Sequence, residues 1–258
     1  MPMTIELTKF MRYSFMLAIN ILFAACNSDR EAHTFFSQGR VIVDSTAQGN
    51  EFLPFDQGDN GAYYPVYYLG KQTDTLFLGH RPISMFSTEE LENRYDSARN
   101  WNSPADMNID VRVDTSMNGG HDIIYSHFSE DNEREIIDST KSIKAFTVFI
   151  ANMSDSLVMM GSHNFVGYLT REVLGIDGKW IEVEHRLTDL CGAAKRSLIL
   201  EPGAIMVAKL LRYKGDTKFS CRLKLSMKYG SVEAYKTYSN IYVDYFDNGI
   251  LHLDKESI

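Results

Sequence analysis

The residues whose types and spacing could do chemistry are few, and the clearest set follows a tight turn. Trp180, Glu182 and Glu184 stand at every second position after Asp177-Gly178. Alternate residues of a strand point to the same face, so this pattern predicts an indole platform beside two carboxylates. Such a face could bind a carbohydrate, and the alternative is an ordinary solvated surface. Hydrolysis is disfavoured, because a glycosidase needs its two acids to face each other across the substrate.

Two other segments contain the residue types of metal ligands without the spacing of a site. His121, Asp122 and His127 are close in sequence, but no further ligand completes a zinc-like set. The segment Asp56-Gln57-Gly58-Asp59-Asn60-Gly61 is similar to a calcium loop, but it lacks the full series of oxygen ligands and the terminal Glu. We therefore predict polar turns here, with no metal and no cofactor.

No catalytic motif is present in the sequence. It contains no Gly-x-Ser-x-Gly elbow, phosphate loop or dinucleotide fingerprint. Ser162 and His163 are adjacent, but neighbours on a strand point to opposite faces and cannot act on one substrate atom. We therefore predict no catalytic residues and a protein that is not an enzyme.

The three cysteines are Cys26, Cys191 and Cys221. In an oxidising compartment the last two could form a disulfide that closes a loop of about 30 residues, which would contribute about 3–4 kcal/mol to stability. Sequence spacing does not show whether the two Cα atoms come within bonding distance. The pairing of Cys191 with Cys221 therefore stays open at this point.

The first 26 residues differ from the rest of the chain. Lys9 and Arg12 precede an apolar run, Tyr13–Ala25, that ends directly at Cys26. A basic start followed by a short apolar core is typical of a secretory signal, and the run is shorter than the about 20 residues that cross a bilayer. The alternative is a buried N-terminal helix with an unmodified cysteine. We expect a signal peptide over residues 1–26.

The Ala24-Ala25-Cys26 ending resembles the lipobox of bacterial lipoproteins. This resemblance implies that the Cys26 thiol is acylated, with palmitate-type chains, and becomes the new N-terminus. We then expect a lipid-anchored protein of the cell envelope, on a membrane that faces the periplasm or the cell exterior.

The charge balance of the chain is acidic. The net charge is −8, and removal of residues 1–26 takes away Lys9, Arg12 and Glu6, which leaves −9. A negative field disfavours nucleic acid as a partner. It suits either simple solubility or a basic protein partner.

Runs of Val, Ile, Tyr, Phe and Thr between Gly, Asn and Asp predict a mainly β chain. The expected strands cover residues 40–44, 63–69, 75–78, 107–114, 145–152, 157–160, 165–176, 179–186, 197–200, 205–213, 218–229 and 232–245. We expect residues 63–69 to pair with 75–78. One helix is expected over residues 88–99, with Ser87 as its N-cap and Glu90 closing a capping box.

The spacing of these elements predicts the domain organisation. Residues 143–247 should form an antiparallel, immunoglobulin-like β-sandwich, because many short strands follow one another without a helix. A smaller β-containing segment, residues 27–142, should precede it and include the helix. Its residues 115–142 are polar and are predicted to be a long connection, and residues 248–258 are predicted to be a tail. Whether residues 27–142 form a separate domain is left open.

The later part of the chain resembles uncharacterised lipoprotein domains of Bacteroidota-type bacteria. The residues that carry the resemblance are Asn152-Met153-Ser154-Asp155, Asp177-Gly178-Lys179-Trp180-Ile181-Glu182, Cys191-Gly192, Tyr213-Lys214-Gly215-Asp216 and Tyr238-Ser239-Asn240. These are mostly turn and strand residues, so the resemblance implies a fold and a location but no activity.

Three functions follow as hypotheses. The leading one is a non-catalytic binding module for a protein partner, anchored to the membrane through Cys26. A close variant is an immunity-type lipoprotein that neutralises a basic toxin. The third is a glycan-binding component of an uptake system, with Trp180, Glu182 and Glu184 as its face.

Overall fold

Strands dominate the part of the chain that the structure describes, as the sequence predicts. This computed structural model describes residues 41–46, 48–55, 61–83, 88–99, 106–129, 135–186, 197–229 and 232–247. All of them belong to one compact unit, Val41–Ile258. The expected signal peptide with Cys26, the expected tail and Cys191 lie outside the described residues.

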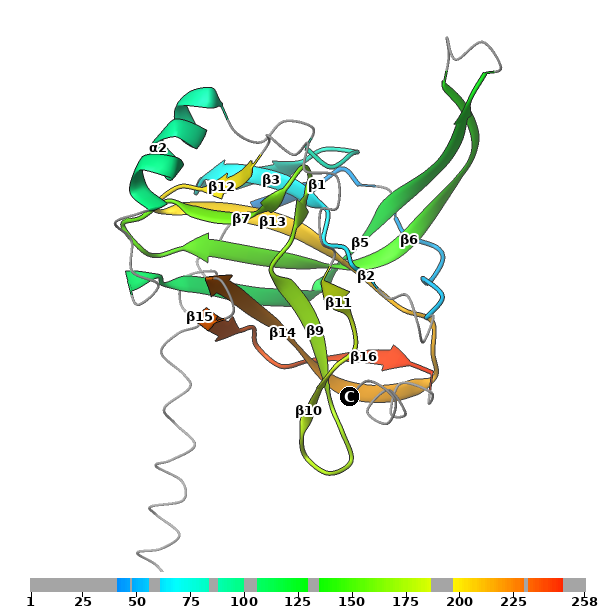
Figure 1. Cartoon of the computed structure of the whole chain (residues 1–258). Coiled ribbons are helices and arrows are strands. Elements are labelled where there is room, and N and C mark those ends of the chain that lie inside the picture. The colour runs from blue at the N-terminus through cyan, green and yellow to red at the C-terminus, as the bar shows by residue number, and fades with distance from the viewer. Residues whose placement is uncertain are drawn as a thin grey trace, which may run out of the picture. The chain divides into compact units, whose positions relative to one another are not determined.

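The elements of this unit are sixteen strands and one helix among the described residues (Figure 1). They are β1 (Val41–Asp44), β2 (Gly61–Ala62), β3 (Val66–Lys71), β4 (Thr75–Leu78), α2 (Glu89–Arg99), β5 (Ile109–Phe128), β6 (Glu135–Asn152), β7 (Val158–Ser162), β8 (Phe165–Val166), β9 (Leu169–Leu174), β10 (Trp180–Glu182), β11 (His185–Arg186), β12 (Ser197–Leu200), β13 (Ala204–Leu211), β14 (Thr217–Tyr229), β15 (Val232–Tyr238) and β16 (Tyr242–Phe246).

Two antiparallel sheets enclose the main core. The first has the order β3-β13-β6-β5, and the second has the order β10-β9-β14-β15, with β16 also paired to β14. Apolar side chains of both sheets meet in one cluster, for example Val148 and Ile150 of β6 with Leu223 and Leu225 of β14. The arrangement is mainly β, antiparallel and consistent with a β-sandwich, which confirms the predicted fold class.

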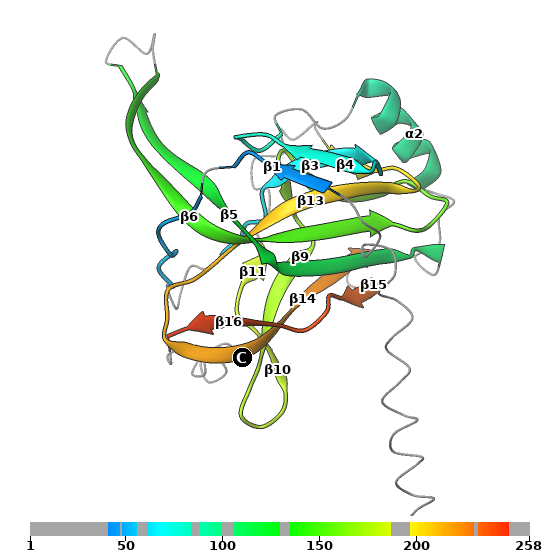
Figure 2. The ribbon, with the colours of Figure 1, turned by 180° about the vertical axis from the view of Figure 1, so that it is seen from behind.

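The predicted pairing of residues 63–69 with 75–78 is wrong. Strand β3 pairs with β13, while β4 has the same bounds as predicted but pairs in parallel with β1. Figure 2 shows β1 and β4 beside β3. Val66 of β3 is fully buried, and the strand forms one edge of the first sheet, where it pairs with β13. A local sequence pattern predicts that a segment is a strand, but it does not predict which other strand will pair with it.

The predicted polar connection over residues 115–142 is also wrong. Strands β5 and β6 continue through this region and pair out to Phe128↔Glu135. Their distal parts project from the rest of the unit as a two-stranded arm, formed by residues 122–128 and 135–142 (Figure 1). Most side chains toward its tip meet solvent on both faces, so the sequence there lacks the apolar alternation of a half-buried strand.

The boundary predicted between residues 142 and 143 does not separate two sheets. Strands β3 and β5 come from the earlier segment; β3 pairs with β13 of the later one, and β5 pairs with β6, which itself runs across the boundary. The earlier segment therefore contributes two of the four strands of the first sheet, and its strands share the main core.

Two local predictions are confirmed. Asp177-Gly178 turns β9 into β10 with Trp180 opposite Leu174, and Gly178 has a φ of 78°, which favours glycine. The helix α2 begins at Glu89, but its cap is Thr88, whose hydroxyl accepts a hydrogen bond from the Leu91 N–H at 3.2 Å. The expected N-cap, Ser87, lies outside the described residues. No helix in the described ranges is long and apolar enough to cross a membrane.

Candidate binding surfaces

The predicted aromatic face lies on the outer side of the second sheet. Trp180 and Glu182 of β10 stand opposite Leu174 and Glu172 of β9. The Arg222 guanidinium lies 4.2 Å from the centre of the Trp180 ring and 3.7 Å from that of Tyr238. It thereby occupies ring surface that a sugar would use for stacking.

Ion pairs cover the rest of this outer face. Arg222 Nε lies 2.7 Å from Glu172 Oε2, and Lys224 Nζ lies 3.2 Å from Glu182 Oε2 and 3.9 Å from Glu172 Oε1. Each carboxylate is therefore matched by a cation in the same sheet. This pattern is that of a solvated, ion-paired sheet surface.

Glu184 does not join this face, so the predicted set of three residues is corrected. Strand β10 ends at Glu182, and Glu184 turns into the interior, where it is 5% exposed. Its carboxylate accepts hydrogen bonds from the Tyr64 hydroxyl and, at 3.1 Å, from the Tyr213 hydroxyl. The period-two pattern predicted a strand that continues through Glu184, whereas the chain bends after Glu182.

Arg171 is the centre of a buried ionic cluster. Its guanidinium lies 3.3 Å from Glu184 Oε1 and 3.4 Å from Asp244 Oδ2, and it donates a hydrogen bond of 2.6 Å to the Leu211 carbonyl. The Tyr213 ring lies under it at 4.8 Å. Burial alone would lower the pKa of Arg171, but Glu184 and the neighbouring tyrosines outweigh it and raise the pKa. This cluster is enclosed, and its charges are paired with one another, so it holds β9, β16 and the Glu184 segment together. A substrate could not reach it.

The histidines singled out in the sequence lie in different environments. His121 is buried, with Nδ1 at 2.9 Å from the Tyr67 hydroxyl, and burial lowers its pKa to about 4. His127 lies on the exposed arm, with Nδ1 at 2.9 Å from Asp138 Oδ1. Asp122 accepts a hydrogen bond from the Ser142 hydroxyl. Within the described residues no group of three or more His, Cys, Asp or Glu side chains could hold a metal ion.

Cys221 lies in the core between the two sheets. It is a free thiol, fully buried, and burial raises its pKa to about 12. Its Sγ lies 3.6 Å from the Phe219 carbonyl, to which the thiol donates. Cys191 lies outside the described residues, so its pairing with Cys221 stays a prediction.

The arm exposes large apolar side chains, and sequence reasoning missed it. These residues are Ile124 (38% exposed), Tyr125 (45%), Ile136 (41%) and Ile137 (56%). Consecutive residues of a strand point to opposite faces, so each face of the arm presents one from each strand. None of the other described elements covers either face of the arm at these positions.

A bulge sets the place where the arm leaves the sheet. Asp114 stands opposite Thr147 and Gly119 opposite Ala145, so residues 115–118 are inserted opposite a single residue of β6. Asp114 Oδ1 accepts hydrogen bonds from the Ser116 N–H at 2.9 Å and the Ser116 hydroxyl at 2.6 Å. Bulges bend a strand and change its twist, so this insertion directs the arm away from the core.

The fold and these surfaces define a mainly β protein whose antiparallel sheets carry a projecting arm. No family model matches the chain, and neither the curated proteins nor the solved structures contain a match. The immunoglobulin-like type and the resemblance to Bacteroidota-type lipoproteins therefore stay predictions.

Proposed function

We propose that this protein is a lipid-anchored, non-catalytic binding module of the cell envelope, and that it engages a protein partner through the arm. The observation that carries the proposal is the exposure of Ile124, Tyr125, Ile136 and Ile137 on a ribbon that no other described element covers. Contiguous exposed apolar side chains are typical of interaction sites on soluble domains.

The energetics of the arm support a partner. A two-stranded ribbon alone is marginally stable in water, and its apolar side chains contribute to stability only when they leave water. A partner that packs on the arm removes them from water, at about 25 cal/mol per Å² of apolar surface buried. Tyr125 can supply both an apolar ring and a hydroxyl, a combination that is enriched in interfaces.

The charge of the chain indicates the chemistry of the partner. The net charge is −8, and the segment that joins β5 to β6 includes Glu130, Asp131 and Glu133 in its sequence. An acidic chain attracts basic surfaces and speeds their association at low salt. The partner surface that fits best is apolar at its centre and basic around it.

The immunity-type hypothesis is a special case of this proposal. A basic toxin has the required charge, and co-expression of the toxin with this chain tests for protection.

The glycan hypothesis has less support, because Glu184 is buried and Arg222 lies against both Trp180 and Tyr238. A glycan array with the Trp180→Ala variant tests it separately.

The anchor is tested through Cys26. Labelled palmitate should be incorporated into the wild-type chain and not into Cys26→Ser, and the variant should leave the membrane fraction. Several acyl chains hold firmly, since each buried CH₂ contributes about 0.8 kcal/mol. Equal labelling of both chains would remove the anchor from the proposal.

The arm is tested by capture from native membranes in mild detergent. The double variant Ile124→Thr, Ile137→Thr keeps β-branched side chains on the arm but makes them polar. The matched control is Ile176→Thr, because Ile176 is 91% exposed in the β9–β10 turn, away from the arm. We expect one recurrent protein with the wild type and the control, and its loss with the double variant.

The fold of the double variant is checked by hydrogen exchange of the amides in residues 122–128. Unchanged protection there would show that the arm is intact. Capture of the same protein by all three chains would then contradict the assignment of the arm as the binding surface.

A further inference from the structure

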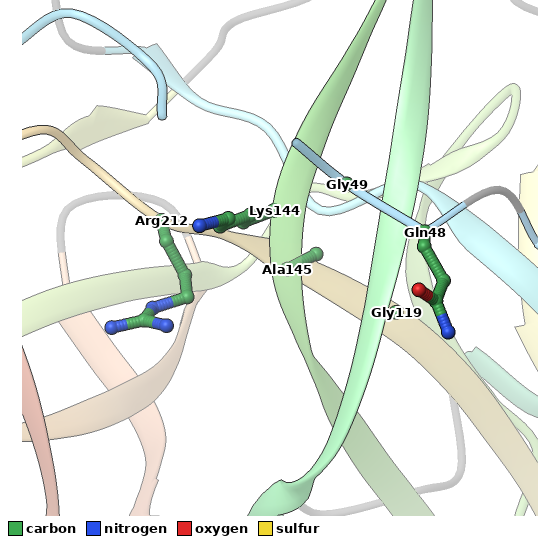
Figure 3. A pocket seen from close by; sticks show the side chains of 6 residues that line it. All are labelled: Gln48, Gly49, Gly119, Lys144, Ala145 and Arg212. Carbon is green, nitrogen blue, oxygen red and sulfur yellow. The ribbon is translucent and has the colours of Figure 1, made fainter. Parts of the chain in front are cut away.

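A cavity of about 320 Å³ lies at the root of the arm (Figure 3). Its lining combines two basic side chains with small or amide residues: Gln48, Gly49, Gly119, Lys144, Ala145 and Arg212. No acidic side chain of the described residues lines it.

The two cations of the cavity share one aromatic neighbour. Lys144 Nζ lies 4.3 Å from the centre of the Phe52 ring, and the Arg212 guanidinium carbon lies 5.3 Å from the same point. The separation of the two charges is therefore at most the sum of these distances. In Figure 3 both side chains extend to the same side of the two strands, and Gln48 lies on the other side. An anion that lies between two such cations is attracted by both of them.

The carboxylates nearby do not neutralise this pair. Asp244 binds Arg212 through Nε at 3.0 Å, but it is shared with Arg171. In the described ranges the terminal nitrogens of Arg212 donate no hydrogen bond, and the Lys144 ammonium has no carboxylate within ion-pair distance. Among the described residues, two carboxylates, those of Glu184 and Asp244, pair with this group of three cations: Arg171, Arg212 and Lys144. One positive charge at the cavity is therefore left without a carboxylate.

The backbone around the cavity holds Lys144 in place. A Cβ added to Gly49 would lie 2.4 Å from the Lys144 Cα, so only glycine permits this close crossing of β6. The Lys144 N–H donates to the Glu51 carbonyl at 2.8 Å, and the Arg212 N–H donates to the Lys144 carbonyl at 2.8 Å. The two basic residues are therefore fixed to each other through the main chain, and only their side-chain ends can adjust.

We propose that this cavity binds an oxyanion, a carboxylate or phosphate group, between Lys144 and Arg212. Arg presents planar N–H donors that match the oxygens of such a group, and Lys adds a mobile point charge. The proposal does not depend on the arm or its partner, because it rests on the charges of the isolated chain.

The test is a titration of the purified full-length chain with inorganic phosphate, and separately with acetate, at constant ionic strength set with chloride. Amide signals of Gly49 and Gly119 in ¹H–¹⁵N spectra report on the cavity. We expect saturable shifts for at least one of the two anions. Saturation by phosphate alone would identify a site for a doubly charged group, and saturation by both would identify one that also accepts a carboxylate.

Two variants decide whether the shifts belong to this site. Lys144→Gln should weaken binding about tenfold or more, as expected for the loss of one charge-assisted contact. Lys179→Gln is the matched control, because Lys179 lies in the exposed β9–β10 turn, and it should bind as the wild type does. Shifts that stay linear in anion concentration, or that are equal in Lys144→Gln, would overturn the proposal.

Discussion

Arg171 Nη1 lies 3.4 Å from Asp244 Oδ2 at a depth where neither side chain is in contact with solvent. Arg171 comes from β9 and Asp244 from β16, two strands that both pair with β14 and share Cys221 as a partner position. Burying a charge costs free energy, and this cost is offset only when the buried charge keeps its oppositely charged partners. The pair therefore ties β9 to β16 across β14.

Replacement of Arg171 by Met should destabilise the fold strongly. Glu184 and Asp244 would both lose a buried cation, and breaking a buried pair on one side typically costs about 3–5 kcal/mol. Urea unfolding followed by tryptophan fluorescence measures the change. The control is Lys179→Met, which removes a largely exposed pair with Asp177 and should leave the urea midpoint unchanged. A midpoint for Arg171→Met close to that of the control would show that the cluster is not needed for stability.

The pair between Asp44 and Lys209 should respond asymmetrically to mutation. Lys209 is fully buried on β13, and its Nζ lies 2.5 Å from Asp44 Oδ2, while the Asp44 side chain is 19% exposed. Asp44→Ala leaves a buried ammonium without its carboxylate, but Lys209→Met leaves a carboxylate that water can reach. We expect Asp44→Ala to lower the unfolding free energy by about 2 kcal/mol more than Lys209→Met. Equal effects in urea unfolding would contradict this asymmetry.

His121 should make the stability of the fold depend on pH. Burial lowers its pKa from 6.5 to about 4, so the unfolded chain takes up a proton at a higher pH than the folded chain does. Stability should therefore decrease as the pH falls from about 6.5 to about 4, by about 3 kcal/mol from this residue, and then level off. The difference between wild type and His121→Gln isolates the effect in urea titrations at several pH values. An equal slope in both chains over that interval would exclude His121 as its source.

Cys221 should resist modification while the protein is folded. Its thiol is buried and its pKa is raised to about 12, and the thiolate is the reactive form. Iodoacetamide at pH 8 should label Cys221 only after denaturation, as measured by peptide mass spectrometry. Rapid labelling in the native state would contradict the buried position. A peptide that links Cys221 to Cys191 would show that the disulfide forms.

Local patterns predicted many of the elements correctly. Strands β4 and β12 have the predicted bounds, and Asp177-Gly178 forms the predicted turn, because these features depend on neighbours in sequence. The arm could not be predicted in the same way. Its two strands pair with each other and are solvated on both faces, so the apolar period of a strand is absent there.

The buried charges were missed for a related reason. Arg171, Glu184, Lys209 and Asp244 are types that are almost always at the surface, and only long-range pairing permits their burial. A partial signal was present in Asp244, which alternates with Tyr242 and Phe246 on β16, two residues that are buried. That period places the carboxylate on the core face of the strand, but the sequence does not show which cations it meets.

The most direct test of the arm as a binding surface is site-specific photocrosslinking in cells that make the protein natively. A photoreactive residue is placed at Ile137 on the arm in one chain and at Ile176 in the β9–β10 turn in another. We predict one recurrent protein adduct from position 137, with a basic surface, and none of it from position 176. No adduct from position 137, or the same adducts from both positions, would contradict a binding role for the arm.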